Sequence, residues 1–456
     1  MAFYRVYPSK DSWITNRAAA DDTSLAATGS NHGESPSLNV FAFAADVSPN
    51  AIDVARSLIK FDLTELSGKI YSEGLIPSAS VVYYLKMFDM KHSDTVPTSY
   101  DLLIFPTSRS WDEGTGIDDD NDRDSGAVNW MQPTSTTNWV VTGSDFLATE
   151  YGSASMHFDK GSEDLEVRID DMVIGWLTGA IANNGMLIKF SDTEENTGDY
   201  YRKAFHARES KYIDRIPYLE ARWDDTVKDN RENFALNQSS SLYLYNVIRG
   251  ELIDLTAPVI VRLQDSLGTP GYSIELTASR IETGIYRTTA YLTASGLSSS
   301  WHDIWFSGSR AYMTGTFTPL VLTGSEIDPY DEFDVDVTNL KRVYGSNEEA
   351  RLNVSVRKRD WITHVGPIFS ASAAFPVENI EKMYYSIINE DSGEVVVPFG
   401  TGSLAYTQLS YNGDGNYFNL SMNSFVPGFK YRIKFLIDIN RYTKAIIDDN
   451  FTFKVV

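Results

Sequence analysis

The sequence contains no cysteine among its 456 residues. Neither disulfides nor thiolate metal sites are therefore available, and each domain has to be stabilised by packing. Histidine is also scarce, and the six residues are scattered along the chain: His32, His92, His157, His206, His302 and His364. No two of them have the spacing of a zinc-binding pair, which argues against a catalytic zinc centre.

Positive charge is in short supply. Lysine and arginine total 39 against 62 acidic residues, a formal net charge of −23. Such a chain repels nucleic-acid phosphates, and its densest basic run, Arg357 to Arg359, is short and embedded in a strand-like stretch. We therefore expect no direct nucleic-acid partner.

Long hydrophobic runs are missing as well. No apolar stretch approaches the roughly 20 residues needed to span a bilayer, so we expect no membrane insertion. The N-terminal residues enter a strand-like pattern at once and show no basic segment followed by an apolar one. The sequence therefore predicts no secretion signal.

Catalytic motifs are not found. The chain has no Gly-x-Ser-x-Gly elbow, no phosphate-binding P-loop and no dinucleotide glycine motif. Adjacent carboxylates such as Asp224/Asp225 and Glu194/Glu195 could serve a glycosidase, yet 62 acidic residues make such pairs common by chance. We predict that the protein is not an enzyme and has no catalytic residues and no cofactor, and we keep a polysaccharide hydrolase as the third hypothesis.

Aromatic residues are plentiful, with 26 Tyr, 23 Phe and 9 Trp. Aromatic rings favour strands because they pack well on a pleated surface, so the composition predicts an all-β protein. Two phrases, Arg56 to Leu66 and Phe205 to Trp223, have the pattern of the opening and closing strands of one β-sandwich. One helix is predicted over 170–181, where acidic residues occupy the first turn.

Composition shifts divide the chain into three β-domains. The first covers 1–225, and a polar stretch at 226–241 is predicted to be a linker. Short strands about ten residues apart over 242–323 predict an immunoglobulin-like sandwich. A turn-rich linker at 324–332 then leads to a C-terminal sandwich over 333–456.

An acidic loop is the densest cluster of oxygen ligands. Alternate carboxylates at Asp118, Asp120, Asp122 and Asp124 could surround a structural Ca²⁺ ion. However, Arg123 replaces the turn glycine of an EF-hand loop. A solvated acidic loop without metal is the alternative that we favour.

Tryptophans in loop-like stretches are the second candidate site: Trp111, Trp130, Trp139, Trp301 and Trp305. If exposed, their rings could stack on sugars. Tryptophan is equally enriched in cores and at protein interfaces. We favour the core or interface interpretation.

Residues 1–225 resemble the DNRLRE-type domain, a jelly-roll β-sandwich grouped with carbohydrate-binding modules. The resemblance rests on the order of several phrases: Asp11 to Ile14, Asn31 to Gly33 before Leu38 to Val40, Arg56 to Leu63, Ser80 to Leu85, the helix around Trp176, and Phe205 to Glu209 ahead of Pro217 to Leu219. It implies a jelly roll with one short helix. It also implies glycan or interface roles for Arg56, His206, Arg208 and Glu209, which either touch a ligand or pin the sandwich.

The whole chain is similar to structural proteins of tailed bacteriophages. The similarity is carried by phrases such as Tyr218 to Asp225, Leu242 to Asn246 and Trp305 to Gly315. It implies a virion component of the tail, neck, collar or capsid surface, assembled in the host cytoplasm in several copies and contacting portal, tail, collar or capsid proteins. The second hypothesis is an adhesin whose first sandwich binds a host-surface glycan.

Overall fold

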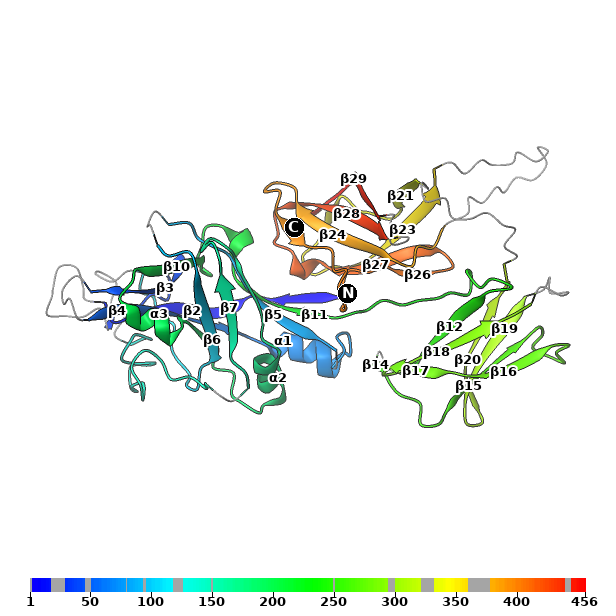
Figure 1. Ribbon diagram of the computed structural model, residues 1–456, viewed down its shortest axis with the longest axis horizontal. Helices are drawn as coiled ribbons and strands as arrows, with labels where there is room; N and C mark the ends of the chain where they lie inside the picture. Colours follow the sequence, from blue (N-terminus) through cyan, green and yellow to red (C-terminus); the bar gives the residue numbers. More distant parts are fainter. Residues whose placement is uncertain are drawn as a thin grey trace. The chain divides into compact units, whose positions relative to one another are not determined.

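The computed structural model describes residues 2–17, 29–45, 51–78, 80–92, 96–117, 126–148, 151–248, 251–293, 300–320, 332–359, 378–438 and 444–456. Its Cα positions divide into two compact units (Figure 1). One unit comprises Phe3–Ser72 and Val81–Arg222, and the other comprises Met1–Ala2, Glu73–Ser80 and Trp223–Val456. Both units are built from β-sheets with few helical turns, and all strand pairs in the described residues are antiparallel except β22 with β29, so the predicted all-β, β-sandwich class is confirmed.

The first unit contains two sheets. The smaller has the strand order β1-β11-β5-β8, and the larger has the order β10-β3-β4-β9-β6-β7 with β2 added alongside β4. Their strands are β1 (Phe3–Val6), β2 (Pro8–Thr15), β3 (Ser37–Ala44), β4 (Ile52–Phe61), β5 (Val82–Met87), β6 (Tyr100–Pro106), β7 (Ala154–Phe158), β8 (Leu165–Arg168), β9 (Met186–Phe190), β10 (Tyr201–His206) and β11 (Tyr218–Arg222).

Strand β4 is the centre of this unit because both of its faces are covered. Val54 and Leu58 on one face pack against Trp111, Trp130 and Trp139 from the segment after β6. Ala55, which points to the other face, packs in a second cluster: Trp13, Phe41 and Phe43. A strand buried on both faces needs a covering layer besides the opposite sheet, and the segment after β6 supplies it here.

The predicted closing strand is confirmed, because the phrase that ends at Trp223 contains β11, the last strand of this unit, but the predicted opening strand is wrong. The phrase beginning at Arg56 forms β4, an internal strand that ends at Phe61, and Leu66 lies in the short helix α1 (Thr64–Ser67). Instead β1 opens the unit, and it pairs antiparallel with β11. The alternation of apolar residues located a strand correctly but carried no information on its partners.

The predicted helix forms as α2 (Asp170–Thr178) and ends three residues early. Gly179 adopts a left-handed conformation with φ 74°, which glycine accommodates without strain, and its backbone N–H closes the helix on Trp176. Further helical turns are η2 (Gly68–Ser72), α3 (Asp192–Thr197), η3 (Ile213–Arg215) and η4 (Met422–Ser424).

The second unit includes a sandwich formed by residues 239–317. One sheet has the order β12-β18-β17 and the other has the order β16-β15-β19-β20, with a β13-β14 hairpin beside them. The strands are β12 (Ser239–Tyr245), β13 (Val247–Ile248), β14 (Glu251–Leu252), β15 (Val259–Gln264), β16 (Ser273–Thr277), β17 (Ser279–Glu282), β18 (Ile285–Tyr291), β19 (Trp301–Ser307) and β20 (Arg310–Phe317).

The C-terminal sandwich belongs to the same unit. Its sheets have the orders β21-β23-β27-β26 and β22-β29-β28-β24-β25 (Figure 1). The strands are β21 (Phe333–Val337), β22 (Val343–Tyr344), β23 (Glu349–Lys358), β24 (Met383–Asn389), β25 (Val395–Val397), β26 (Ser410–Asn412), β27 (Gly415–Ser421), β28 (Lys430–Asp438) and β29 (Lys444–Val455). Most of the predicted 324–332 linker lies outside the described residues.

The polar stretch at 226–241, predicted as a linker, is folded. Val227 donates its backbone N–H to Ser410 Oγ at 2.9 Å, and Lys228 forms a bridge with Tyr411. Phe234 is fully buried in the core of the second sandwich. The polar composition was misleading because this stretch is held by backbone hydrogen bonds and by a few buried side chains. Such contacts produce no periodic pattern of hydrophobic residues in the sequence.

Replacing Trp305 tests the core of the second sandwich. Trp305 is fully buried and donates its indole N–H to Asp303 Oδ2 at 2.7 Å. We expect Trp305→Ala to lower the free energy of unfolding of this sandwich by about 3–5 kcal/mol, because it leaves a cavity and removes one of the two hydrogen bonds that Asp303 Oδ2 accepts. Amide hydrogen exchange of peptides from β15, β18 and β19 measures the loss.

The matched control is Tyr291→Ala, because Tyr291 lies in the same sandwich and is 57% exposed. It should change the same quantity by less than about 0.5 kcal/mol. Equal effects of the two substitutions would contradict the assignment of Trp305 to the core.

Candidate functional site

Four separate segments of the first unit meet in one polar group, the Asp11 cluster, which consists of Asp11, Asn31, Glu113 and Arg208. Strand β2 carries Asp11, and the other three residues lie in loops. Arg208 donates its backbone N–H to Asp11 Oδ2 at 2.7 Å and its Nη2 to Glu113 Oε2 at 3.0 Å. Glu113 Oε1 accepts the backbone N–H of Asp11 at 2.7 Å, so the three residues form a closed ring of contacts.

Asn31 joins the loop around Gly33 to the segment after β6. Its Nδ2 donates to the backbone oxygens of Glu113 at 2.7 Å and Val128 at 2.8 Å, while its Oδ1 accepts the N–H of Gly116 at 2.9 Å. Gly114 has φ +79°, and a Cβ there would lie 2.3 Å from Asn31 Oδ1. The turn therefore requires glycine at 114, both for its dihedral angle and for space.

Burial dominates the electrostatics of the cluster. It raises the pKa of Asp11 to about 7, although the Arg208 N–H opposes the shift, and the carboxylates of Glu113 and Glu209 add to it. Burial also raises the pKa of Glu113. A carboxyl group that titrates near neutrality can serve as a general acid, but Asp11 is 1% exposed and has no access to a substrate. The arrangement therefore fastens loops together.

Arg56, predicted as a glycan or interface residue, has its donors engaged within the unit. Its Nε and Nη2 bind Glu195 at 3.0 and 2.7 Å, and its Nη1 donates to the Gly143 oxygen at 2.8 Å. The guanidinium lies 5.2 Å from the centre of the Trp130 ring. Of the two roles that the sequence left open for Arg56, pinning the sandwich is the one that fits this geometry.

The loop tryptophans are not exposed, which agrees with the favoured core interpretation and not with the sugar-stacking alternative. Trp111, Trp130 and Trp139 are 1%, 9% and 5% exposed, and Trp301 and Trp305 are buried in the second sandwich. Trp111 and Trp139 donate their indole N–H groups to backbone oxygens at 2.9 Å. Because the segment after β6 lies against β4, residues that resemble loop aromatics in the sequence belong to the core.

His206 and Glu209 complete the predicted set. His206 is buried, its Nδ1 lies 2.9 Å from Ser210 Oγ, and burial lowers the pKa of its imidazole. Glu209 is 44% exposed at its side chain and pairs with Arg208 at 3.3 Å. Within the predicted set, Glu209 therefore has a carboxylate that remains accessible to solvent.

The calcium candidates Asp118, Asp120, Asp122 and Asp124 lie outside the described residues. Within the part of the chain that the structure describes, no group of three His, Asp or Glu side chains could hold a metal ion. Of the carboxylate pairs, Glu195 is bound to Arg56, and Glu194 accepts a hydrogen bond from the Ser191 hydroxyl. That pair therefore does not resemble two free carboxylates in a glycosidase cleft.

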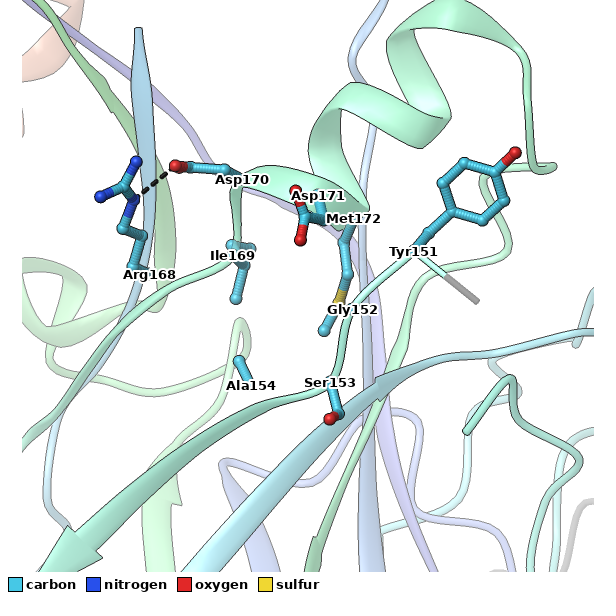
Figure 2. A pocket seen from close by; sticks show the side chains of 9 residues that line it. All are labelled: Tyr151, Gly152, Ser153, Ala154, Arg168, Ile169, Asp170, Asp171 and Met172. Atoms are coloured by element: carbon cyan, nitrogen blue, oxygen red, sulfur yellow. Dashed lines mark hydrogen bonds and ion pairs between the residues drawn. The ribbon is translucent and has the colours of Figure 1, made fainter. Parts of the chain in front are cut away.

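One pocket of about 300 Å³ opens beside the start of α2. Figure 2 shows the Arg168–Asp170 ion pair on one side, the Tyr151 ring on the other, and Asp171 and Met172 between them. Tyr151 is 39% exposed, and its backbone has a positive φ of 58°. An accessible ring beside carboxylates is an arrangement that can contact a sugar.

Sequence reasoning missed the partners that give the predicted residues their roles. Glu113 and Lys189 were not selected, and Glu195 was named only as half of a carboxylate pair. However, Glu113 connects the Asp11 cluster, and Glu195 binds both Arg56 and Lys189. One local signal existed for Glu113, which lies in the Trp111 to Gly114 phrase beside a predicted site tryptophan. Glu195 had none, because it is 139 residues from Arg56.

Comparisons with known proteins give only remote similarity. No family model matches the sequence, and no curated protein matches it. Among solved structures, the N-terminal Ig1-2 module of Drosophila receptor protein tyrosine phosphatase DLAR is 10% identical, covers 51% of this chain and 97% of its own, and has a TM-score of 0.17. A chimeric titin Z1Z2 is 14% identical over 49% of this chain and 90% of its own, with a TM-score of 0.16.

A tetra-tandem repeat from the extending region of a large adhesion protein covers 88% of this chain and 70% of its own at 12% identity, with a TM-score of 0.16. Likeness at this level carries no argument about fold or function. Among the described residues, no helix has the length and apolar character needed to cross a membrane.

Asp11→Asn tests the electrostatics of the Asp11 cluster. The folded-state pKa of about 7 lies above the unfolded value of 3.8, so stability from this group is fully present below pH 3.8 and is lost as the pH rises to 7. We expect Asp11→Asn to remove this loss. Relative to wild type, it should gain about 2–3 kcal/mol of unfolding free energy between pH 5 and pH 8.

Urea unfolding at pH 5 and at pH 8 measures the difference in unfolding free energy. The unfolding is monitored by hydrogen exchange of peptides from β2. Asp112→Asn is the matched control, because Asp112 is a neighbour of Glu113 that is exposed to solvent. If the unfolding free energies of Asp11→Asn and Asp112→Asn have the same dependence on pH, burial does not raise the pKa of Asp11.

Proposed function

We propose that the protein is a non-enzymatic structural component of a tailed-phage virion that acts through protein–protein contacts. The observation that carries the proposal is an accessible apolar face on the second sandwich. The similarity of the sequence to structural proteins of tailed phages supports it. So does the first unit, in which most of the predicted site residues that the structure describes are engaged with other residues of the same unit.

The Ile260 face consists of Ile260, Ile304 and Phe306 on the sheet β16-β15-β19-β20. Successive side chains along a strand point to opposite faces of the sheet. Val259, Val261 and Trp305 occupy the core. Their neighbours Ile260, Ile304 and Phe306 therefore point outward. Ile260 pairs with Phe306 across the strands, and Arg262 lies 5.0 Å from the centre of the Phe306 ring. Ile260 is 40% exposed.

Other exposed apolar side chains lie in the same sandwich, around the β13-β14 hairpin and between β15 and β16: Val247, Ile248, Leu252, Ile253, Leu267 and Tyr272. Exposed apolar surface is costly in water and is typical of surfaces that become covered by a partner. Aromatic and aliphatic residues at the centre of such a contact contribute most of its binding energy. Portal, tail, collar or capsid proteins, present in several copies, are the partners that we propose.

The double variant Ile260→Ser with Phe306→Ser tests the proposal. Loss of two central anchors costs about 2 kcal/mol or more of binding, which corresponds to a fall of roughly thirtyfold in affinity. We expect the variant to fold, since both residues face outward, but to be depleted from particles when it replaces the wild-type chain. Quantitative mass spectrometry of purified particles measures its copy number.

The matched control is Arg287→Ser with Thr289→Ser, two exposed residues on β18 in the opposite sheet. This control should enter particles at the wild-type level. Wild-type incorporation of the Ile260 and Phe306 variant would contradict the role of this face, and absence of the wild-type chain from particles would contradict the function itself.

The pocket beside α2 favours a second candidate function, glycan binding by the first sandwich. Tyr151 presents an accessible ring, and Asp171 and Ser153 supply hydrogen-bonding groups near it. The pocket holds two carboxylates, and its one arginine is paired with Asp170. A neutral sugar therefore suits it better than an acidic glycan.

Tyr151→Ala tests the second candidate. Removal of the ring should weaken binding to neutral glycans on an array at least tenfold, which is about 1.4 kcal/mol. Tyr71→Ala is the control, because Tyr71 is 52% exposed and does not line the pocket. No binding by the wild-type chain, or equal binding by both variants, would exclude this pocket as a glycan site.

A further inference from the structure

Lys203 is a lysine enclosed in the first unit. It lies on β10, its side chain is fully buried, and its Nζ is 2.5 Å from Asp89 Oδ1. The same Nζ donates to the backbone oxygens of Gly161 at 3.0 Å and Glu163 at 2.7 Å. An amine and a carboxyl group are thus held together away from water.

The surroundings of the pair are aromatic. Nζ lies 4.9 Å from the centre of the Phe158 ring and 5.2 Å from that of Phe205. Asp89 forms a backbone bridge with Phe205, and its N–H donates to Asp164 Oδ1 at 2.8 Å, so both reactants are fixed by the backbone. Burial lowers the pKa of Lys203 against the opposing effect of Asp89, which favours the neutral amine.

Glu163 contributes a further carboxylate within electrostatic range of Lys203. Its Oε1 accepts the backbone N–H groups of Asp159 and Lys160. Its Oε2 is buried and has no hydrogen-bond partner among the described residues. Burial opposes the shift, but the hydrogen bonds from the backbone N–H groups, together with the charge of Lys203, hold the pKa of Glu163 below its usual value, so the carboxylate is ionised.

We propose that Lys203 and Asp89 condense to an intramolecular isopeptide bond. Lys203 Nζ attacks Asp89 Cγ, a C–N bond forms, and one C–O bond of the carboxyl group breaks. The ammonium gives up two protons, both of which leave with the departing oxygen as water, and the positive and negative charges cancel. Glu163 takes the first proton from the amine and passes it to the Asp89 oxygen, so no oxidant or other reactant is needed.

The geometry suits this step. With Nζ 2.5 Å from Oδ1, the carboxyl carbon one bond further on is close to the roughly 3–3.5 Å separation of reacting atoms in a near-attack arrangement. The bond would join residues 114 positions apart. A covalent cross-link stabilises a protein by reducing the conformational freedom of its unfolded chain, as a disulfide does. The isopeptide bond would have this effect in a chain that has no cysteine. This inference is independent of the proposed virion function.

Intact mass spectrometry of the full denatured chain tests the bond. We expect a mass lower than that of the sequence by one water molecule. Dehydration at Asp414-Gly415 would give the same loss, so peptide mapping has to find the peptides containing residues 89 and 203 joined by an amide. A wild-type chain with its full sequence mass, or a loss that maps elsewhere, overturns the proposal.

Three variants give the assignment its controls. Lys203→Arg keeps a cation and should restore the full mass, and Lys189→Arg, at another buried lysine paired with carboxylates, should leave the loss of water intact. Loss of water in Lys203→Arg, or the full mass in Lys189→Arg, would overturn the proposal.

Glu163→Gln should fold, as judged by circular dichroism, yet form the bond at least tenfold more slowly. Bond formation at the wild-type rate would overturn the role of Glu163 as the proton carrier.

Discussion

Charged side chains buried between loops and sheets are the constraint on which the first unit depends. A chain without cysteine has to hold its loops by packing and polar contacts, and here Arg56 reaches Glu195 while Arg208 reaches Glu113. Breaking a buried pair by removing one partner costs about 3–5 kcal/mol, because the other charge stays buried and uncompensated. The same device recurs in the second unit, where Arg231 binds Asp303 at 2.6 Å.

These pairs explain why the long segment after β6 is part of the core. Gly143 accepts a hydrogen bond from Arg56, and Glu113 closes the ring with Asp11 and Arg208. The tryptophans of the segment then cover the outer face of β4. Residues that a ligand could have used are consumed internally, so external contacts have to come from other surfaces, namely the Ile260 face and the pocket beside α2.

The sequence was sufficient for the class of fold because strand patterns are local. Val259, Val261 and Leu263 alternate with outward residues, and this period of two predicts a half-buried strand without knowledge of its partners. The start of α2 was predictable from Asp170 and Asp171 for the same reason. Strand pairing was not, since β1 and β11 lie more than 200 residues apart.

Site residues were harder to predict because their roles depend on distant partners. Arg56 and Arg208 were identified, but Glu195 and Glu113, which decide that they act internally, are 139 and 95 residues away from them. Trp111 was identified in a loop-like stretch with a core or interface role favoured, and the structure buries it in the core. A local pattern cannot report which loop folds over which strand.

Cryo-electron microscopy of the intact phage particle is the measurement that bears most directly on the central claim. The account predicts density for the β-sandwiches at fixed, symmetric positions, with neighbouring virion proteins burying roughly 1,000 Å² or more against the chain. Particles that contain no density for this chain, while the purified protein binds a glycan through the first sandwich, would contradict it.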